Sequence, residues 1–82
     1  MKRYVLKDVM NYLYEEERPT CTAFYGIRGI NIGYDHQNYY KKSLGYKTSK
    51  SALEGREKLL KKLSADKYYE HTVTMITVDV DE

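Results

Sequence analysis

The sequence predicts one α+β domain: an N-terminal helix, an antiparallel sheet of about three to four strands, a second helix packed on that sheet, and a C-terminal strand. Three observations support this prediction. Apolar residues recur at helical spacing in two stretches, glycine-punctuated segments rich in Thr, Tyr and Ile lie between them, and β-branched residues dominate the end. A chain of 82 residues fits a single domain with one thin core.

The first helix is expected over residues 6–17. Its apolar stripe has helical spacing and consists of Leu6, Val9, Met10 and Leu13. Pro19 ends the pattern, because proline cannot continue a helix. Residues 3–6 are alternatively a short strand, since Tyr and Val favour strands and no strong N-cap precedes Leu6.

A β-hairpin or a bulged strand pair is expected over residues 20–34. Two stretches alternate between apolar and other residues: Ala23, Tyr25 and Ile27, then Ile30, Ile32 and Tyr34. Gly26-Ile27-Arg28-Gly29 superficially resembles the G-x-x-G loop of KH domains. That loop joins two helices, whereas both flanks here have strand composition, so a glycine-dependent hairpin is favoured.

A polar turn at residues 35–38 is expected to lead into another strand over residues 39–47. Tyr40, Lys42, Leu44 and Tyr46 alternate there with Tyr39, Lys41, Ser43 and Lys47. One face of this strand is rich in lysine.

The second helix is predicted from Ser51-Ala52-Leu53-Glu54, which has the form of a capping box. An apolar stripe follows: Ala52, Leu53, Leu59, Leu60 and Leu63. Glu54 with Lys58, and Glu57 with Lys61, are i,i+4 pairs in the favourable order. Gly55 weakens a helix by about 1 kcal/mol relative to Ala, so we expect it to allow close packing against the sheet.

The C-terminal strand is expected over residues 68–80, which are rich in β-branched residues. Thr72, Thr74, Ile76, Val78 and Val80 fall on one face. The other face is amphipathic too, so either both faces are covered or the strand pairs across a dimer. A homodimer is the expectation, because a thin core gains from a partner.

Charge is unevenly distributed along the chain. Residues 19–65 hold nine basic and three acidic residues, whereas residues 66–82 have a net charge of −4. Ten tyrosines accompany one phenylalanine and no tryptophan, and half of them lie in or beside the basic region. This region either contacts a polyanion or is an ordinary solvated face, and the tyrosines either form contact surfaces or cover a shallow core.

The sequence favours neither catalysis nor a bound metal or cofactor. His36 and His71 lie in different predicted elements, with no metal-ligand spacing nearby, and nothing next to Cys21 suggests an activated nucleophile. A lone cysteine and the lack of a secretory or membrane-spanning pattern lead us to expect a cytoplasmic protein, in the host cytoplasm if it is viral.

The segment Lys42-Ser43-Leu44-Gly45-Tyr46-Lys47-Thr48-Ser49-Lys50-Ser51-Ala52 resembles the strand-to-helix junction of arm-binding domains of tyrosine recombinases and of ethylene-response-factor DNA-binding domains. These families lay a three-stranded sheet in the major groove and brace it with the following helix. The resemblance, over residues 22–64, implies that Tyr39, Lys41, Ser43 and Lys47 face DNA. Their tryptophan and arginine base readers are missing here, and lysines with tyrosines suit sequence-tolerant binding.

Two hypotheses follow. The first is a non-enzymatic protein that binds RNA or DNA through Arg28, Tyr39, Lys41, Lys42, Lys47 and Lys50. The second is a protein-binding inhibitor of a host or defence enzyme with no nucleic-acid contact, since the basic middle and acidic end suit a bipolar protein interface. The size and the tyrosine-rich, tryptophan-free composition resemble those of small phage accessory proteins, for which an anti-defence role is one expectation.

Overall fold

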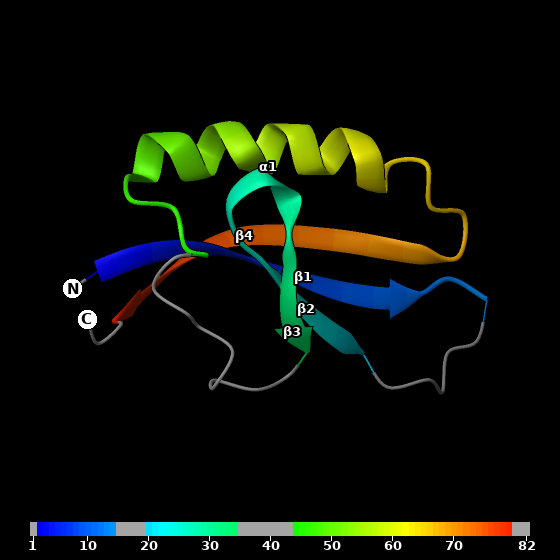
Figure 1. The fold of residues 1–82 in the computed structure, drawn as a ribbon. Coiled ribbons are helices and arrows are strands. Elements are labelled where there is room, and N and C mark those ends of the chain that lie inside the picture. Colours follow the sequence, from blue (N-terminus) through cyan, green and yellow to red (C-terminus); the bar gives the residue numbers. More distant parts are fainter. Residues whose placement is uncertain (1, 15–19, 35–43, 80–82) are drawn as a thin grey trace.

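The computed structural model describes residues 2–14, 20–34 and 44–79, and they form an antiparallel four-stranded sheet with one helix on it (Figure 1). The strands are β1 (Lys2–Tyr12), β2 (Cys21–Tyr25), β3 (Asn31–Tyr34) and β4 (Tyr69–Asp79). A 3-10 turn, η1 (Ile27–Gly29), joins β2 to β3, and the helix α1 is Ser49–Leu63. The α+β class and the antiparallel sheet are therefore confirmed.

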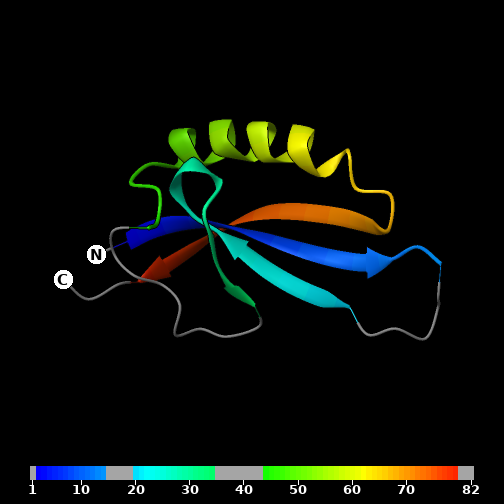
Figure 2. The ribbon, with the colours of Figure 1, turned by 45° about the vertical axis from the view of Figure 1, so that its right-hand side comes forward.

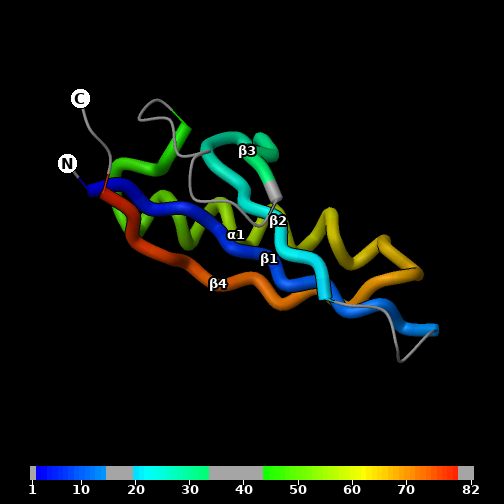
Figure 3. The backbone as a smooth tube through the Cα atoms, turned by 90° about the horizontal axis from the view of Figure 1, so that it is seen from below, coloured from blue at the N-terminus to red at the C-terminus, as the bar shows by residue number. Residues whose placement is uncertain are grey.

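The strand order is β3-β2-β1-β4, with β1 and β4 paired along their whole length of 11 residues (Figure 3). The helix lies across one face of this sheet (Figure 2). Its described length is 15 residues, and no described helix is long and apolar enough to cross a membrane.

The expected N-terminal helix over residues 6–17 is wrong, because its described part belongs mainly to β1. Leu6 lies on the helix-covered face of the sheet and Val5 on the opposite face, and both are almost fully buried. Asp8 occupies a position on the helix-covered face where an alternating strand would carry an apolar residue. The strand pattern of β1 is therefore hard to recognise in the sequence. Pairing with β2 and β4 outweighs the helical spacing of a few apolar side chains.

Two small cores lie on opposite faces of the sheet. Under α1 the buried residues are Leu6, Tyr46, Ala52, Leu59 and Val73. On the other face they are Val5, Phe24 and Ile32, with Leu44, Ile76 and Val78 packed against them. Both faces of β4 thus contribute to packing, which agrees with the amphipathic pattern of this strand. The strand itself is confirmed within one residue at each end.

The predicted hairpin is confirmed, with β2 and β3 antiparallel and a register shift between Phe24 and Tyr25. Inside η1, Arg28 and Gly29 adopt left-handed φ values of 58° and 70°. Glycine takes such a conformation easily, but arginine takes it rarely. The turn is held by backbone hydrogen bonds from Gly26 to Ile30 (2.8 Å) and from Ile27 to Leu44 (2.7 Å).

The residues before α1 differ from the predicted strand over 39–47. Residues 39–43 of that strand lie outside the described residues, and Leu44–Lys47 form turns around a single bridge from Tyr46 to Tyr4 rather than a strand. The cap of α1 is also one turn earlier than predicted. Thr48, not Ser51, is the N-cap, and its hydroxyl oxygen accepts the backbone N–H of Ser51 at 3.1 Å.

Gly55 has the packing role that the sequence predicts. A methyl group at this position would overlap the hydroxyl of Tyr46, whose ring is buried between the sheet and α1. The hydroxyl also lies near the backbone of Gly29. Tyr46 therefore joins the sheet, α1 and η1, and fixes how the turn sits against the helix.

Candidate functional site

Six exposed cations project from η1, from the turn before α1 and from α1 itself: Arg28, Lys47, Lys50, Lys58, Lys61 and Lys62. We call this set the α1 basic face. On the helix, Lys50 and Lys61 lie on the side opposite the buried Ala52 and Leu59, whereas Lys58 and Lys62 lie on the flank that faces η1. The only carboxylates on the helix are those of Glu54 and Glu57. The described part of the basic middle segment therefore presents an excess of positive charge to solvent.

None of these cations forms an ion pair within the described residues. The two i,i+4 pairs predicted from the sequence, Glu54 with Lys58 and Glu57 with Lys61, are not closed there either. Exposed pairs of this kind contribute only about 0.3 to 0.5 kcal/mol, so solvation competes well with them. Lys58 and Lys61 consequently keep ammonium groups that an external anion can contact.

A cavity of about 340 Å³ lies between η1 and α1. We call it the η1–α1 cavity. Its polar walls consist of Arg28, Tyr46, Ser51, Glu54, Lys58 and Lys62. The ammonium of Lys62 reaches toward the turn, 3.9 Å from the position that a Cβ on Gly29 would take. Three cations from two distant parts of the chain thus converge on one hollow.

Half of the residues predicted for nucleic-acid binding can be placed. Arg28 lines the η1–α1 cavity, and Lys47 and Lys50 are exposed at the start of α1. Tyr39, Lys41 and Lys42 lie outside the described residues, as do Ser43 and His36. Sequence reasoning left both Lys58, which it paired with Glu54, and Lys62 out of the predicted binding residues. The i,i+4 spacing of these two lysines on the helix was the available signal.

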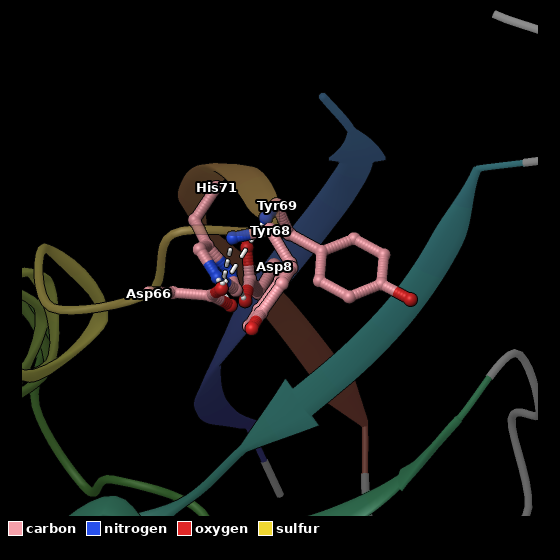
Figure 4. A network of polar contacts seen from close by, with 5 residues as sticks. All are labelled: Asp8, Asp66, Tyr68, Tyr69 and His71. Atoms are coloured by element: carbon pink, nitrogen blue, oxygen red, sulfur yellow. Dashed lines mark hydrogen bonds and ion pairs between the residues drawn. The ribbon is translucent and has the colours of Figure 1, made fainter. Parts of the chain in front are cut away.

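A second polar feature joins the far end of the sheet to the connection after α1 (Figure 4). The ring of His71 lies between two carboxylates, with Nδ1 2.6 Å from Asp8 Oδ2 and Nε2 2.6 Å from Asp66 Oδ2. Asp8 is fully buried, and its Oδ1 has no hydrogen-bond partner among the described residues. Asp66 also accepts the backbone N–H groups of Tyr68 and Tyr69.

The geometry of this network favours a protonated His71. Each of its ring nitrogens lies 2.6 Å from a carboxylate oxygen, and a ring that carries both protons can donate to both. Burial opposes the charge, but hydrogen bonds to Asp66 and Asp8 outweigh it and raise the pKa of His71 above 6.5. The backbone N–H of Tyr68, followed by the contact with His71, lowers the pKa of Asp66 below 3.8. Both ring nitrogens of His71 are engaged, so the network ties together β1, β4 and the α1–β4 connection.

Tyrosine rings gather around this network. Tyr12 contacts Tyr14 and Tyr69, and Tyr14 contacts Tyr68, with ring centroids 5.2 to 6.4 Å apart. Tyr14 and Tyr68 are 69% and 61% exposed. Leu13, which follows the end of β1, is 53% exposed. This tyrosine cluster lies beside Asp66, which accepts the backbone N–H groups of Tyr68 and Tyr69.

The described residues contain no group of three or more His, Cys, Asp or Glu side chains that could hold a metal ion. Cys21 is exposed and free. No family model, no curated protein and no solved structure matches the chain. Its function is therefore inferred from its own side chains.

Proposed function

We propose that this protein binds nucleic acid, RNA or DNA, through the α1 basic face. The observation that carries the proposal is the set of six exposed cations on η1, on α1 and on the turn before α1, none of which forms an ion pair within the described residues. Phosphate contacts by lysine and arginine supply most of the affinity of sequence-tolerant nucleic-acid binding. Tyr39, Lys41 and Lys42 belong to the same proposed surface on the grounds of sequence alone.

Backbone contact fits this surface better than base reading. Five of its six described cations are lysines, which contact phosphate as point charges rather than as the planar forks that read guanine. The exposed tyrosines Tyr14 and Tyr68 lie at the tyrosine cluster beside carboxylates and not on the basic face. We therefore expect little discrimination between sequences.

A fluorescence anisotropy titration with single-stranded RNA, single-stranded DNA and duplex DNA over a salt series tests the proposal. For single strands the logarithm of the affinity should fall with the logarithm of the salt concentration, with a slope of about −2 to −4 for three to six contacts. Lys50→Glu with Lys58→Glu should weaken binding more than about tenfold at low salt and flatten the slope. Lys67→Glu, an exposed lysine near the acidic end of the chain, is the matched control and should bind as the wild type does.

Lys41→Glu with Lys42→Glu tests the sequence-based part of the surface in the same titration. A reduced slope places these two lysines in contact with phosphate. A protein that binds none of the three nucleic acids at low salt refutes the proposed function.

A second candidate function is the binding of a protein partner, as an inhibitor of a host or defence enzyme. The observation that favours it is the exposed tyrosine cluster, because exposed aromatic side chains are common at protein interfaces. A pull-down after nuclease treatment separates the two functions. A partner that is retained supports protein binding, and a partner that is lost supports nucleic-acid binding.

A further inference from the structure

We propose that the η1–α1 cavity binds a terminal phosphate group of a nucleic-acid strand, a proposal that rests on the function proposed above and specifies which part of the ligand this site takes. An internal phosphodiester carries one negative charge, whereas a terminal phosphomonoester carries close to two at neutral pH. A site that matches the second charge therefore selects strand ends.

The charge of the cavity fits a dianion. Arg28, Lys58 and Lys62 line it against the single carboxylate of Glu54, so its walls carry a net charge of +2. No described carboxylate pairs with any of the three cations. A phosphomonoester, with close to two negative charges, would neutralise this net charge. A phosphodiester, with one negative charge, would leave half of the net charge uncompensated.

The donors in the cavity suit phosphate oxygens. The guanidinium of Arg28 can present two parallel N–H groups, and Lys58 and Lys62 lie one helical turn apart on α1. Tyr46 adds a hydroxyl group, whose pKa burial raises and the nearby backbone of Gly29 lowers in part. The volume of about 340 Å³ is at the small end of ligand sites, which suits one nucleotide end.

The position of Arg28 gives a separate argument. Its φ of 58° is left-handed, a conformation that is strained for a residue other than glycine. Asn, Asp or Gly would occupy this turn position with less strain, so folding alone does not explain an arginine there. Strained residues cluster at functional sites, and this one directs a cation at the cavity.

The test compares one single-stranded oligonucleotide in three forms: with a 5′-phosphate, with a 3′-phosphate and with hydroxyl groups at both ends. Anisotropy titrations with the wild-type protein should show about tenfold or tighter binding of one phosphorylated form, the effect of one added charge-assisted hydrogen bond. The two phosphorylated forms identify which end is bound. In a competition assay, a nucleoside monophosphate should displace that form at lower concentration than the nucleoside.

Two variants locate the effect. Arg28→Gly removes the cation and suits the left-handed backbone, so the fold should be retained while the preference for a phosphorylated end disappears. Lys61→Gln also removes one charge from the α1 basic face, but it does not line the cavity. This variant should weaken the binding of all three oligonucleotides by the same factor, so the ratios between their affinities should stay as in the wild type.

Equal affinity of the wild type for the three forms overturns the terminal-phosphate site and leaves the proposed function standing. A preference that survives in Arg28→Gly also overturns it. Failure to bind any form removes the proposed function together with this site.

Discussion

His71→Leu should destabilise the protein by about 3 to 5 kcal/mol, because it leaves the fully buried carboxylate of Asp8 without a partner. Asp8 Oδ1 already lacks a hydrogen bond within the part of the chain that the structure describes, and the variant would leave Oδ2 without its contact to His71 as well. A domain of 82 residues has a total stability of about 4 to 12 kcal/mol, so the loss is a large share of it.

The double variant Asp8→Leu with His71→Leu removes the charge together with its partner. It should therefore recover most of the stability, because a buried ion pair replaced by apolar side chains is often neutral. Urea unfolding at pH 6, followed by circular dichroism, measures both variants against the wild type. If His71→Leu costs less than about 1 kcal/mol, or if the double variant is no more stable than the single one, the buried contact does not act as described.

The same network predicts a pH dependence. The raised pKa of His71 means that its contribution is present in full below 6.5 and is lost as the pH rises through its value in the folded protein. The lowered pKa of Asp66 means that its contribution is present above 3.8 and is lost as the pH falls through its folded value. The double variant keeps the hydrogen bond from Tyr68 to Asp66, so the stability difference between the wild type and this variant should be largest below pH 6.5 and shrink as the pH rises through the folded pKa of His71. A difference that is constant from pH 3 to pH 9 would contradict this.

Three further predictions concern packing and the sheet edge. Gly55→Ala should destabilise the protein by about 1 to 3 kcal/mol, because the added methyl group would overlap the Tyr46 hydroxyl. Alanine usually favours a helix over glycine, so a variant that thermal unfolding shows to be stabilised would refute this prediction. Thr48→Ala should cost about 1 kcal/mol of unfolding free energy in urea, and an unchanged midpoint would show that its cap is dispensable. Arg56 Nε donates to the carbonyl oxygen of Val73 at 2.7 Å and so covers part of the open edge of β4. Arg56→Ala should therefore increase self-association, measured by sedimentation velocity. An unchanged sedimentation coefficient would show that Arg56 does not protect this edge.

The direction of the Val73 carbonyl follows from the ladder. Tyr4 exchanges both backbone hydrogen bonds with Tyr46, on the side of β1 away from β4. In an antiparallel sheet the bonding side alternates, so Asp8 bonds on that side too, and its partner Val73 faces the outer edge of β4. Homodimerisation stays a prediction, and Arg56 occupies part of the edge through which β4 would pair.

The parts of the fold that the sequence predicts well are those with local signals. The hairpin around Gly29, the helix and the β-branched C-terminal strand each have composition and periodicity of their own. Of β1, only residues 3–6 were recognised, as the alternative short strand, because the stability of the rest comes from pairing on both sides with residues distant in the sequence. Asp8 made recognition harder, since its partner His71 is 63 residues away.

The candidate site also has one part that the sequence predicts and another part that it does not. The positive charge of the middle segment is visible in the sequence, and the exposure of Lys47 and Lys50 agrees with it. The convergence of Arg28 with Lys58 and Lys62 depends on how η1 sits against α1, which the buried Tyr46 fixes. No local pattern contains that information.

The central claim, that nucleic acid meets the α1 basic face, is tested most directly by following backbone amide signals by NMR during titration with a single-stranded oligonucleotide. We predict that the shifts concentrate in η1 and on the exposed side of α1, around Arg28, Lys58 and Lys62, and that they diminish with added salt. Shifts confined to the tyrosine cluster around Tyr14 and Tyr68, with η1 and α1 unchanged, would contradict the account.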